Sequence, residues 1–249
     1  MRRYGLKLDD PDDRDHKFKL SWFSPKKYFP LPDSVDLRPW MPPVMDQGSL
    51  GSCTAHGVTA ALRYNLINNG RTDYPLSRLQ LYYDTRALEG DIPEDNGAQI
   101  RNVIKCAAKN GVGRESLWPY DQTKWTQEPP QAVYDDAKHF EALDYRRVDI
   151  DSRAIKTALY VGRPVVIGIA IFPSFESNSV AATGVVPLPG WNEKSIGGHC
   201  MTIHGYQDDV FTVRNSWGTG WGALGDCFIP AAYIEKYGSD FWTIATNNE

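Results

Sequence analysis

Apolar residues in the first half of the chain recur at the three- and four-residue spacing of amphipathic helices. In the first such segment, which begins at Cys53, the apolar positions are Val58, Ala61, Leu62 and Leu66. Ser52 stands at the expected N-cap, where a side-chain oxygen accepts a hydrogen bond from the first turn. The Asn-Asn-Gly run at residues 68–70 predicts the end of this helix.

The same pattern predicts three further helices, at residues 77–88, 98–109 and 151–161. Ser77 stands at the N-cap of the first of them, and glycines follow the ends of the other two.

The pattern changes in the second half to runs that are rich in β-branched residues, which predict strands. These runs lie at residues 163–172, 199–206, 210–216, 226–229 and 241–246. Helices first and antiparallel strands second predict an α+β fold of two lobes. We expect the helical lobe at about residues 45–140 and the sheet lobe at about residues 141–240.

Residues 1–30 follow neither pattern. They are acidic and polar, then aromatic, and contain three prolines, which exclude a long helix. We expect an irregular extension whose second half packs on the folded body. The aromatic residues that suggest this packing are Trp22, Phe23, Tyr28 and Phe29.

Composition and charge exclude several classes of partner. The hydrophobic fraction of 41% and charged fraction of 23% are those of a globular domain. A net charge of −4 gives no reason to expect nucleic acid or a membrane surface as a partner. No apolar run approaches the roughly 20 residues of a membrane span. The N-terminus lacks the apolar core of a secretory signal, so we expect a cytoplasmic protein or one secreted without a recognisable signal.

The four cysteines have no C-x-x-C spacing, and without a secretory signal we expect free thiols. Cys53 is distinctive because it lies in the small-residue stretch QGSLGSCTA at residues 47–55. It would be a buried small residue, a metal ligand or a nucleophile. A cysteine attacks as the thiolate, and its pKa is normally about 8.5. A helix N-terminus stabilises a negative charge by about 0.3–1 kcal/mol. This is less than the ~1.36 kcal/mol that lowers a pKa by one unit. A histidine must therefore supply the larger share of the stabilisation if the thiol is ionised at neutral pH.

His199 is the best of the five histidines for this role. Gly197-Gly198 precede it and let a substrate backbone come close. His204 lies an odd number of residues away on the same strand, so it should face the opposite side. The remaining histidines are His16, His56 and His139.

Three further residues complete a catalytic arrangement around this pair. Asn215, at the end of the next predicted strand, would accept the second ring N–H of the histidine and fix its orientation. Trp217 would cover that hydrogen bond. Gln47 would donate its side-chain amide to an oxyanion, beside the backbone N–H of the cysteine.

These segments together resemble the papain-like cysteine peptidases. The similar segments, in the family's order, are residues 31–44, 47–53, 111–120, 198–206 and 215–222. The resemblance implies two lobes with a cleft between them, the sheet lobe being barrel-like. It also implies a peptidase domain at residues 31–249, preceded by the extension at residues 1–30.

The resemblance implies a role for each site residue. Cys53 would be the nucleophile, His199 the acid and base, Asn215 the orienting group and Gln47 the oxyanion donor. The activity would be endopeptidase cleavage through an acyl-enzyme, with a peptide or protein substrate and no cofactor or metal.

Three positions depart from the family pattern. Leu50 replaces a cysteine that forms a disulfide in secreted members, Thr54 replaces a tryptophan, and Ala98 replaces a glycine. Loss of the disulfide agrees with a prokaryotic or viral branch.

By position in the family, nine residues would contact substrate, and the pocket for the second residue before the cut would be apolar. They are Gly97, Ala98, Gln99, Ile100, Gly168, Gly197, Gly198, Cys200 and Trp217. We also expect residues 1–30 to lie across or beside the cleft and to limit access.

Three alternatives remain open at this point. In the first, the chain is a catalytically silent peptide-binding or partner-binding protein of the same fold. In the second, it transfers the acyl group to an amine. The third is a metal site. A zinc site would draw on Cys53, His56, His199 and either Cys200 or His204, but adjacent strand residues give poor tetrahedral geometry.

Overall fold

The computed structural model describes residues 3–20, 30–138 and 143–246. The aromatic cluster predicted at residues 22–29 and the candidate His139 lie outside these described residues.

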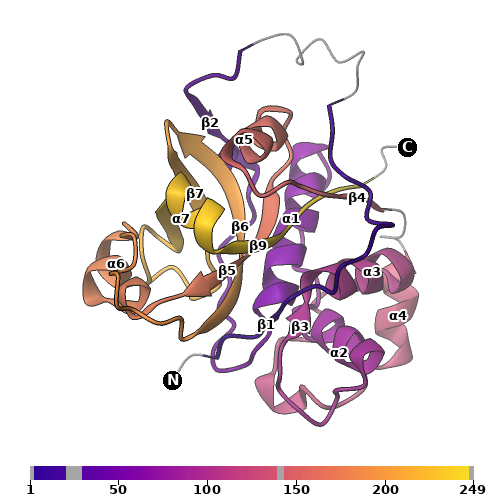
Figure 1. Cartoon of the computed structure of the whole chain (residues 1–249). Helices are drawn as coiled ribbons and strands as arrows, with labels where there is room; N and C mark the ends of the chain where they lie inside the picture. Colours follow the sequence, from indigo (N-terminus) through magenta and orange to yellow (C-terminus); the bar gives the residue numbers. More distant parts are fainter. Residues whose placement is uncertain (1–2, 21–29, 139–142, 247–249) are drawn as a thin grey trace.

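Within the described residues, the longer helices lie in the first half of the chain (Figure 1), and short 3-10 turns accompany the helices. The α-helices are α1 (Cys53–Asn68), α2 (Arg78–Glu89), α3 (Ile100–Asn110), α4 (Gln131–Ala137), α5 (Ser152–Tyr160), α6 (Asn178–Thr183) and α7 (Ala231–Tyr237). The 3-10 turns are η2 (Arg38–Trp40), η3 (Gln122–Lys124) and η5 (Pro173–Glu176).

The strands form one large antiparallel sheet and one small parallel pair. They are β1 (Leu6–Lys7), β2 (Ser34–Asp36), β3 (Ala98–Gln99), β4 (Leu143–Arg147), β5 (Val165–Ile171), β6 (Gly197–Gln207), β7 (Val210–Arg214), β8 (Asp226–Pro230) and β9 (Gly238–Thr246). The large sheet has the order β4-β9-β5-β6-β7-β8, with β2 also paired to β6, whereas β1 pairs with β3. Within the described residues this sheet is open, so the expected barrel-like lobe is not a closed barrel.

Two hydrophobic cores underlie the two lobes. One is built on the sheet with α5, α7 and η5, and the other on α1, α2 and α3. Val166 and Trp242 of the sheet belong to the helical core, so the two cores meet at the sheet. Helix α1 is buried on nearly all sides, as expected for a helix that lies between layers.

Gly57 brings α1 close to the sheet. A β carbon at this position would lie 2.9 Å from the Cys200 sulfur on β6, so a larger residue would require the sulfur or the helix to shift. Cys53 is one turn earlier on the same helix, and His199 precedes Cys200. This glycine therefore sets the distance between the two lobes at the candidate site.

Most predicted elements are confirmed, with small corrections at their ends. The helix predicted from residue 98 begins at Ile100, because Ala98 and Gln99 pair with β1 instead. The predicted capping role of Ser52 is wrong: its side chain accepts no capping hydrogen bond, and its hydroxyl lies 2.5 Å from the Tyr120 hydroxyl. The prediction of free thiols is confirmed for all four cysteines, which are buried. Among the described residues, no helix combines the length and apolarity of a membrane span.

The helical core yields a stability prediction. Leu79 of α2 is fully buried, whereas Leu88 on the same helix is 58% exposed. Leu79→Ala removes buried methyl groups and leaves a cavity, which typically costs about 2–5 kcal/mol. We expect the melting temperature to fall by roughly 5–15 °C for a chain of this size. Calorimetry measures this shift, and Leu88→Ala, the matched control, should change it little; equal shifts would contradict the assigned core.

Candidate active site

Cys53 occupies the first position of α1, where backbone N–H groups have no helical partner. Its side chain is fully buried. The backbone N–H groups of Cys200, Gly5, Thr54 and Cys53 itself favour the charged form of the sulfur and so act to lower its pKa. The thiol of the helical lobe therefore lies against strand β6, immediately beside the position of His199.

His199 and Asn215 are hydrogen-bonded to each other. Nε2 of His199 on β6 lies 2.8 Å from Oδ1 of Asn215, which directly follows β7. The backbone N–H of Ser216 donates to the same Oδ1 over 2.8 Å, so the amide oxygen faces the histidine. Because this oxygen can only accept, Nε2 carries the proton.

Trp217 covers this pair, as the sequence predicts. Its ring stacks on the His199 ring with a centroid distance of 4.9 Å and an interplanar angle of 27°. Trp221 and Phe175 pack against Trp217 from behind, at 4.9 and 5.9 Å. The hydrogen bond between imidazole and amide is thus shielded from water, which strengthens it.

Gln47 is held by Ser216. The Ser216 hydroxyl donates to Oε1 of Gln47 over 2.6 Å, which turns Nε2 toward the carbonyl oxygens of Leu50 and Arg3 at 3.0 and 3.4 Å. Ser216 thus orients both Asn215 and Gln47. No separate signal in the sequence points to this role, because a serine between two motif residues is ordinary until its hydrogen bond to Gln47 is known.

Residues 4–6 of the extension lie directly over these groups. Tyr4 packs edge-on against His199 at 6.1 Å between ring centroids, and the Gly5 carbonyl accepts from the N–H of Ala98 over 2.9 Å. Leu6 lies against Gly168 and Gly198, where added β carbons would come within 2.6 and 3.2 Å of it.

Most of the residues predicted to contact substrate lie together against residues 4–6 of the extension. The extension contacts Gly97, Ala98, Gly168, Gly197 and Gly198, and Tyr4 also lies against Trp217.

Ile100 and Cys200 are instead buried in the helical core, against which Leu6 packs. The side chain of Gln99 donates to Asp10 of the extension over 3.1 Å. Sequence reasoning missed Ile169 and Ser239, which line the cavity around Leu6 and carry no motif.

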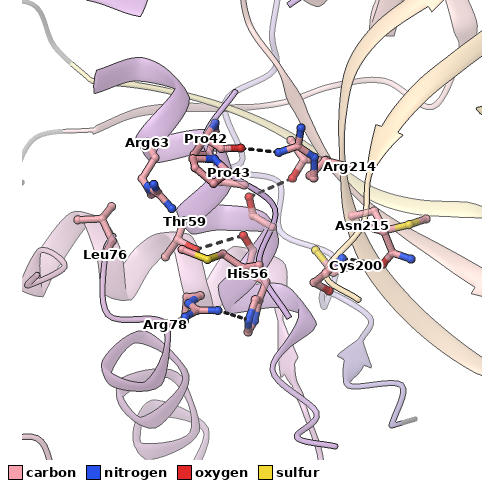
Figure 2. A pocket seen from close by; sticks show the side chains of 16 residues that line it. Pro42, Pro43, His56, Thr59, Arg63, Leu76, Arg78, Cys200, Arg214 and Asn215 are labelled. Carbon is pink, nitrogen blue, oxygen red and sulfur yellow. Dashed lines mark hydrogen bonds between the residues drawn. The ribbon is translucent and has the colours of Figure 1, made fainter. Parts of the chain in front are cut away.

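His56 belongs to a buried polar cluster behind the site. Figure 2 shows Arg78 reaching His56 at one end of a cavity that both lobes line. Nε2 of His56 accepts from Arg78 over 2.9 Å, and Nδ1 donates to the Ser52 carbonyl over 3.0 Å. Burial and the Arg78 charge lower the pKa of His56 to about 3. Both ring nitrogens are engaged, which opposes the zinc alternative; the described residues contain no group of three side chains suited to a metal.

Burial raises the pKa of Cys53 to about 11, although the surrounding N–H groups oppose this. In the covered arrangement, burial therefore favours the protonated thiol. The cause is desolvation of the fully buried sulfur, which the sequence does not reveal.

A family model described as papain family cysteine protease matches residues 31–236. The chain belongs to this papain family.

The sequences of individual relatives support this family assignment. An uncharacterized peptidase C1-like protein of Acanthamoeba polyphaga mimivirus is 42% identical over 80% of this chain and 68% of its own length. Cysteine proteinase 3 of Entamoeba histolytica is 30% identical over 78% of this chain. The chain spans only 61% of that relative's length.

Among solved structures, xylellain, a cysteine protease from Xylella fastidiosa, superposes with a TM-score of 0.89 at 34% identity. The match covers 98% of this chain and 96% of xylellain. The fold is therefore the papain-like fold that the sequence predicts.

The covered thiol yields a prediction for alkylation. Because the pKa of Cys53 is raised, the covered arrangement is stabilised while the thiol is protonated. This stabilisation is complete below the ordinary thiol pKa of about 8.5 and is lost as the pH rises through about 11. We expect iodoacetamide to modify Cys53 slowly at pH 7 and progressively faster toward pH 11. Peptide mapping by mass spectrometry measures the rate, with the fully buried Cys227 as the internal control. Rapid modification of Cys53 at pH 7 would contradict the covered arrangement.

Proposed function

We propose that this papain-family protein is a cysteine endopeptidase, with Cys53 as nucleophile, His199 as acid and base, Asn215 as orienting residue and Gln47 as oxyanion donor. The observation that carries the proposal is the hydrogen bond of 2.8 Å between His199 and Asn215, placed beside a cysteine that begins a helix. That bond commits Nε2 to the amide, so Nδ1 is the ring nitrogen that exchanges protons.

In the proposed reaction, the Cys53 thiol transfers its proton to Nδ1 of His199 and the thiolate attacks the substrate carbonyl carbon. The oxyanion accepts hydrogen bonds from the backbone N–H of Cys53 and from Nε2 of Gln47. The C–N bond then breaks as His199 returns the proton to the leaving amine. Water, deprotonated by His199, hydrolyses the remaining thioester and releases the acid and the free thiol.

We propose that the second residue before the cut is apolar. Leu6 supports this, because its side chain occupies the position that glycines 168 and 198 leave open. The pocket around it is lined by Ile169, Ala170 and Tyr237, among others. An apolar substrate side chain would lose water on entering it.

The extension would limit access to this cleft, as an intramolecular regulator. Its Arg3 carbonyl accepts from Gln47, so it occupies the place of the oxyanion. The extension also passes from Trp217, which Tyr4 contacts, to the apolar pocket, which Leu6 fills. A substrate with its second residue in that pocket would run the opposite way, which explains how the extension can bind without presenting a bond for cleavage.

Outside the cleft, a group of ion pairs attaches the extension to the folded body. Arg101 of α3 pairs with Asp15 at 2.5 Å, and Arg147 of β4 lies 3.3 Å from both Asp9 and Asp15. The Trp242 indole donates to Asp9 over 2.8 Å. The extension is therefore fixed to both lobes.

The first test is cleavage of a mixed peptide library with identified products. We expect hydrolysis by the native chain and a loss of at least about 10³-fold for Cys53→Ala, because the nucleophile is absent. Hydrolysed products with apolar residues at the second position before the cut would support the proposed preference.

Four outcomes would change the proposal. Equal activity of the Cys53→Ala variant would remove Cys53 from the mechanism. Products joined to an amine would indicate acyl transfer instead of hydrolysis. A preference for Arg or Asp at the second position would contradict the apolar pocket. Peptide binding without any cleavage, even with the cleft uncovered, would favour the silent binding protein.

Gly5→Ala tests the covering role. A β carbon at Gly5 would lie 1.8 Å from the backbone oxygen of Gly51, so the variant should dislodge the extension. Overpacking of this kind costs about 1–3 kcal/mol, and we expect kcat/KM on a short peptide to rise about tenfold. Gly220→Ala is the matched control, since a β carbon there meets nothing within 4 Å. Identical kinetics for the native chain and both variants would show that the extension does not limit access.

A further inference from the structure

Two carboxylates hold the residue that follows Leu6. Nζ of Lys7 lies 3.0 Å from Oε2 of Glu89 and 2.5 Å from Oδ2 of Asp91. Burial opposes the charge of Lys7, but the hydrogen bonds to Asp91 and Glu89 outweigh it and raise its pKa. A cation is thus strongly favoured at this point of the cleft.

Glu89 is fixed in place independently of Lys7. Its Oε1 accepts from the backbone N–H of Gln99 and from the side-chain amide of Asn102, both over 3.0 Å. Its side chain is only 9% exposed, at the end of the rigid helix α2. Oε2 is therefore presented toward the cleft whether or not the extension is present.

Asp91 is similarly anchored. Its backbone N–H donates to the Arg86 carbonyl over 2.8 Å, and its Oδ1 lies 3.4 Å from the amide of Asn96. Oδ2 remains directed at Lys7. When the extension leaves, two neighbouring carboxylates lose the cation that separates their charges, so a basic group is the complementary occupant.

The register locates this acidic pair relative to the cut. Strand β1 pairs with β3, with Leu6 opposite Ala98 and Lys7 opposite Gln99. Side chains alternate along an extended chain, so Lys7 points away from the apolar pocket, toward α2. Leu6 marks the second residue before the cut, and the next residue away from Cys53 is the third.

We propose that Glu89 and Asp91 form a subsite that selects lysine or arginine as the third residue before the cut. This inference rests on the proposed endopeptidase function and narrows its substrates to peptides with a basic residue followed by an apolar one. The alternative is that the two carboxylates serve only to anchor the extension.

The experiment uses the full chain with Gly5→Ala, which uncovers the cleft. Peptides carry leucine at the second position before the cut and either lysine or norleucine at the third, so that only the charge differs. We expect kcat/KM to favour lysine about tenfold, the usual range for a hydrogen-bonded charge, and added salt to reduce this ratio.

Glu89→Gln with Asp91→Asn is the decisive variant. Both changes remove charge. Glu89→Gln retains the side-chain oxygen that accepts from Gln99 and Asn102, and Asp91→Asn retains the one that accepts from Asn96. The ratio of kcat/KM for the lysine peptide to that for the norleucine peptide should fall to about onefold. Asp135→Asn is the control for a carboxylate outside the cleft, since Asp135 lies on α4 and pairs with Lys138.

Binding provides a readout that does not depend on catalysis. Calorimetric titration of the same two peptides into Cys53→Ala, Gly5→Ala should give about tenfold tighter binding of the lysine peptide. Equal affinities would overturn the subsite, whether or not the enzyme cleaves either peptide. Cleavage of both peptides at equal rates would also overturn it while leaving the endopeptidase function intact.

Discussion

The contact between the first turn of α1 and strand β6 is the constraint on which the candidate site depends. The two lobes have separate cores, and each core alone would fold its own elements without fixing where the other lies. Gly57 allows the helix to approach until it meets the Cys200 sulfur, and the Cys200 N–H then acts to lower the pKa of Cys53. Because His199 is the preceding residue of a strand held on both sides by β5 and β7, the thiol and the imidazole have little freedom to separate.

The parts of this arrangement that the sequence predicts are those with local signals. Helical spacing, β-branched runs and turn residues locate the long elements, because each pattern reflects one buried face. The candidate site residues are recognisable because their chemistry needs particular types at particular places: a thiol at a helix start, and a histidine after glycines. Short elements such as α4, α6 and β4 have no such pattern, and at Ala98 pairing with β1 overrides the helical spacing.

Contacts between distant segments account for what sequence reasoning missed. Ser216 is identified only by its bond to Gln47 across the cleft. The carboxyl of Glu89 is an ordinary charge near the end of a helix until Gln99 and Asn102 are seen to hold it. The same holds for the thiol: its position at a helix start favours ionisation, but desolvation by burial dominates and raises its pKa. Desolvation is a property of the assembled molecule, and no local pattern in the chain encodes it.

The extension uses two kinds of contact, and their difference matters for the proposed regulation. At residues 4–6 it meets mainly glycines and backbone groups, whereas outside the cleft Asp9 and Asp15 meet the charges of Arg101 and Arg147. A substrate that displaces residues 4–6 need not break the second group. The displaced segment then remains tethered, and a short tether gives an effective concentration in the mM range. Free substrate at a lower concentration competes poorly with the tethered segment for the cleft. The ion pairs outside the cleft, which salt weakens, would therefore govern how readily the cleft stays open.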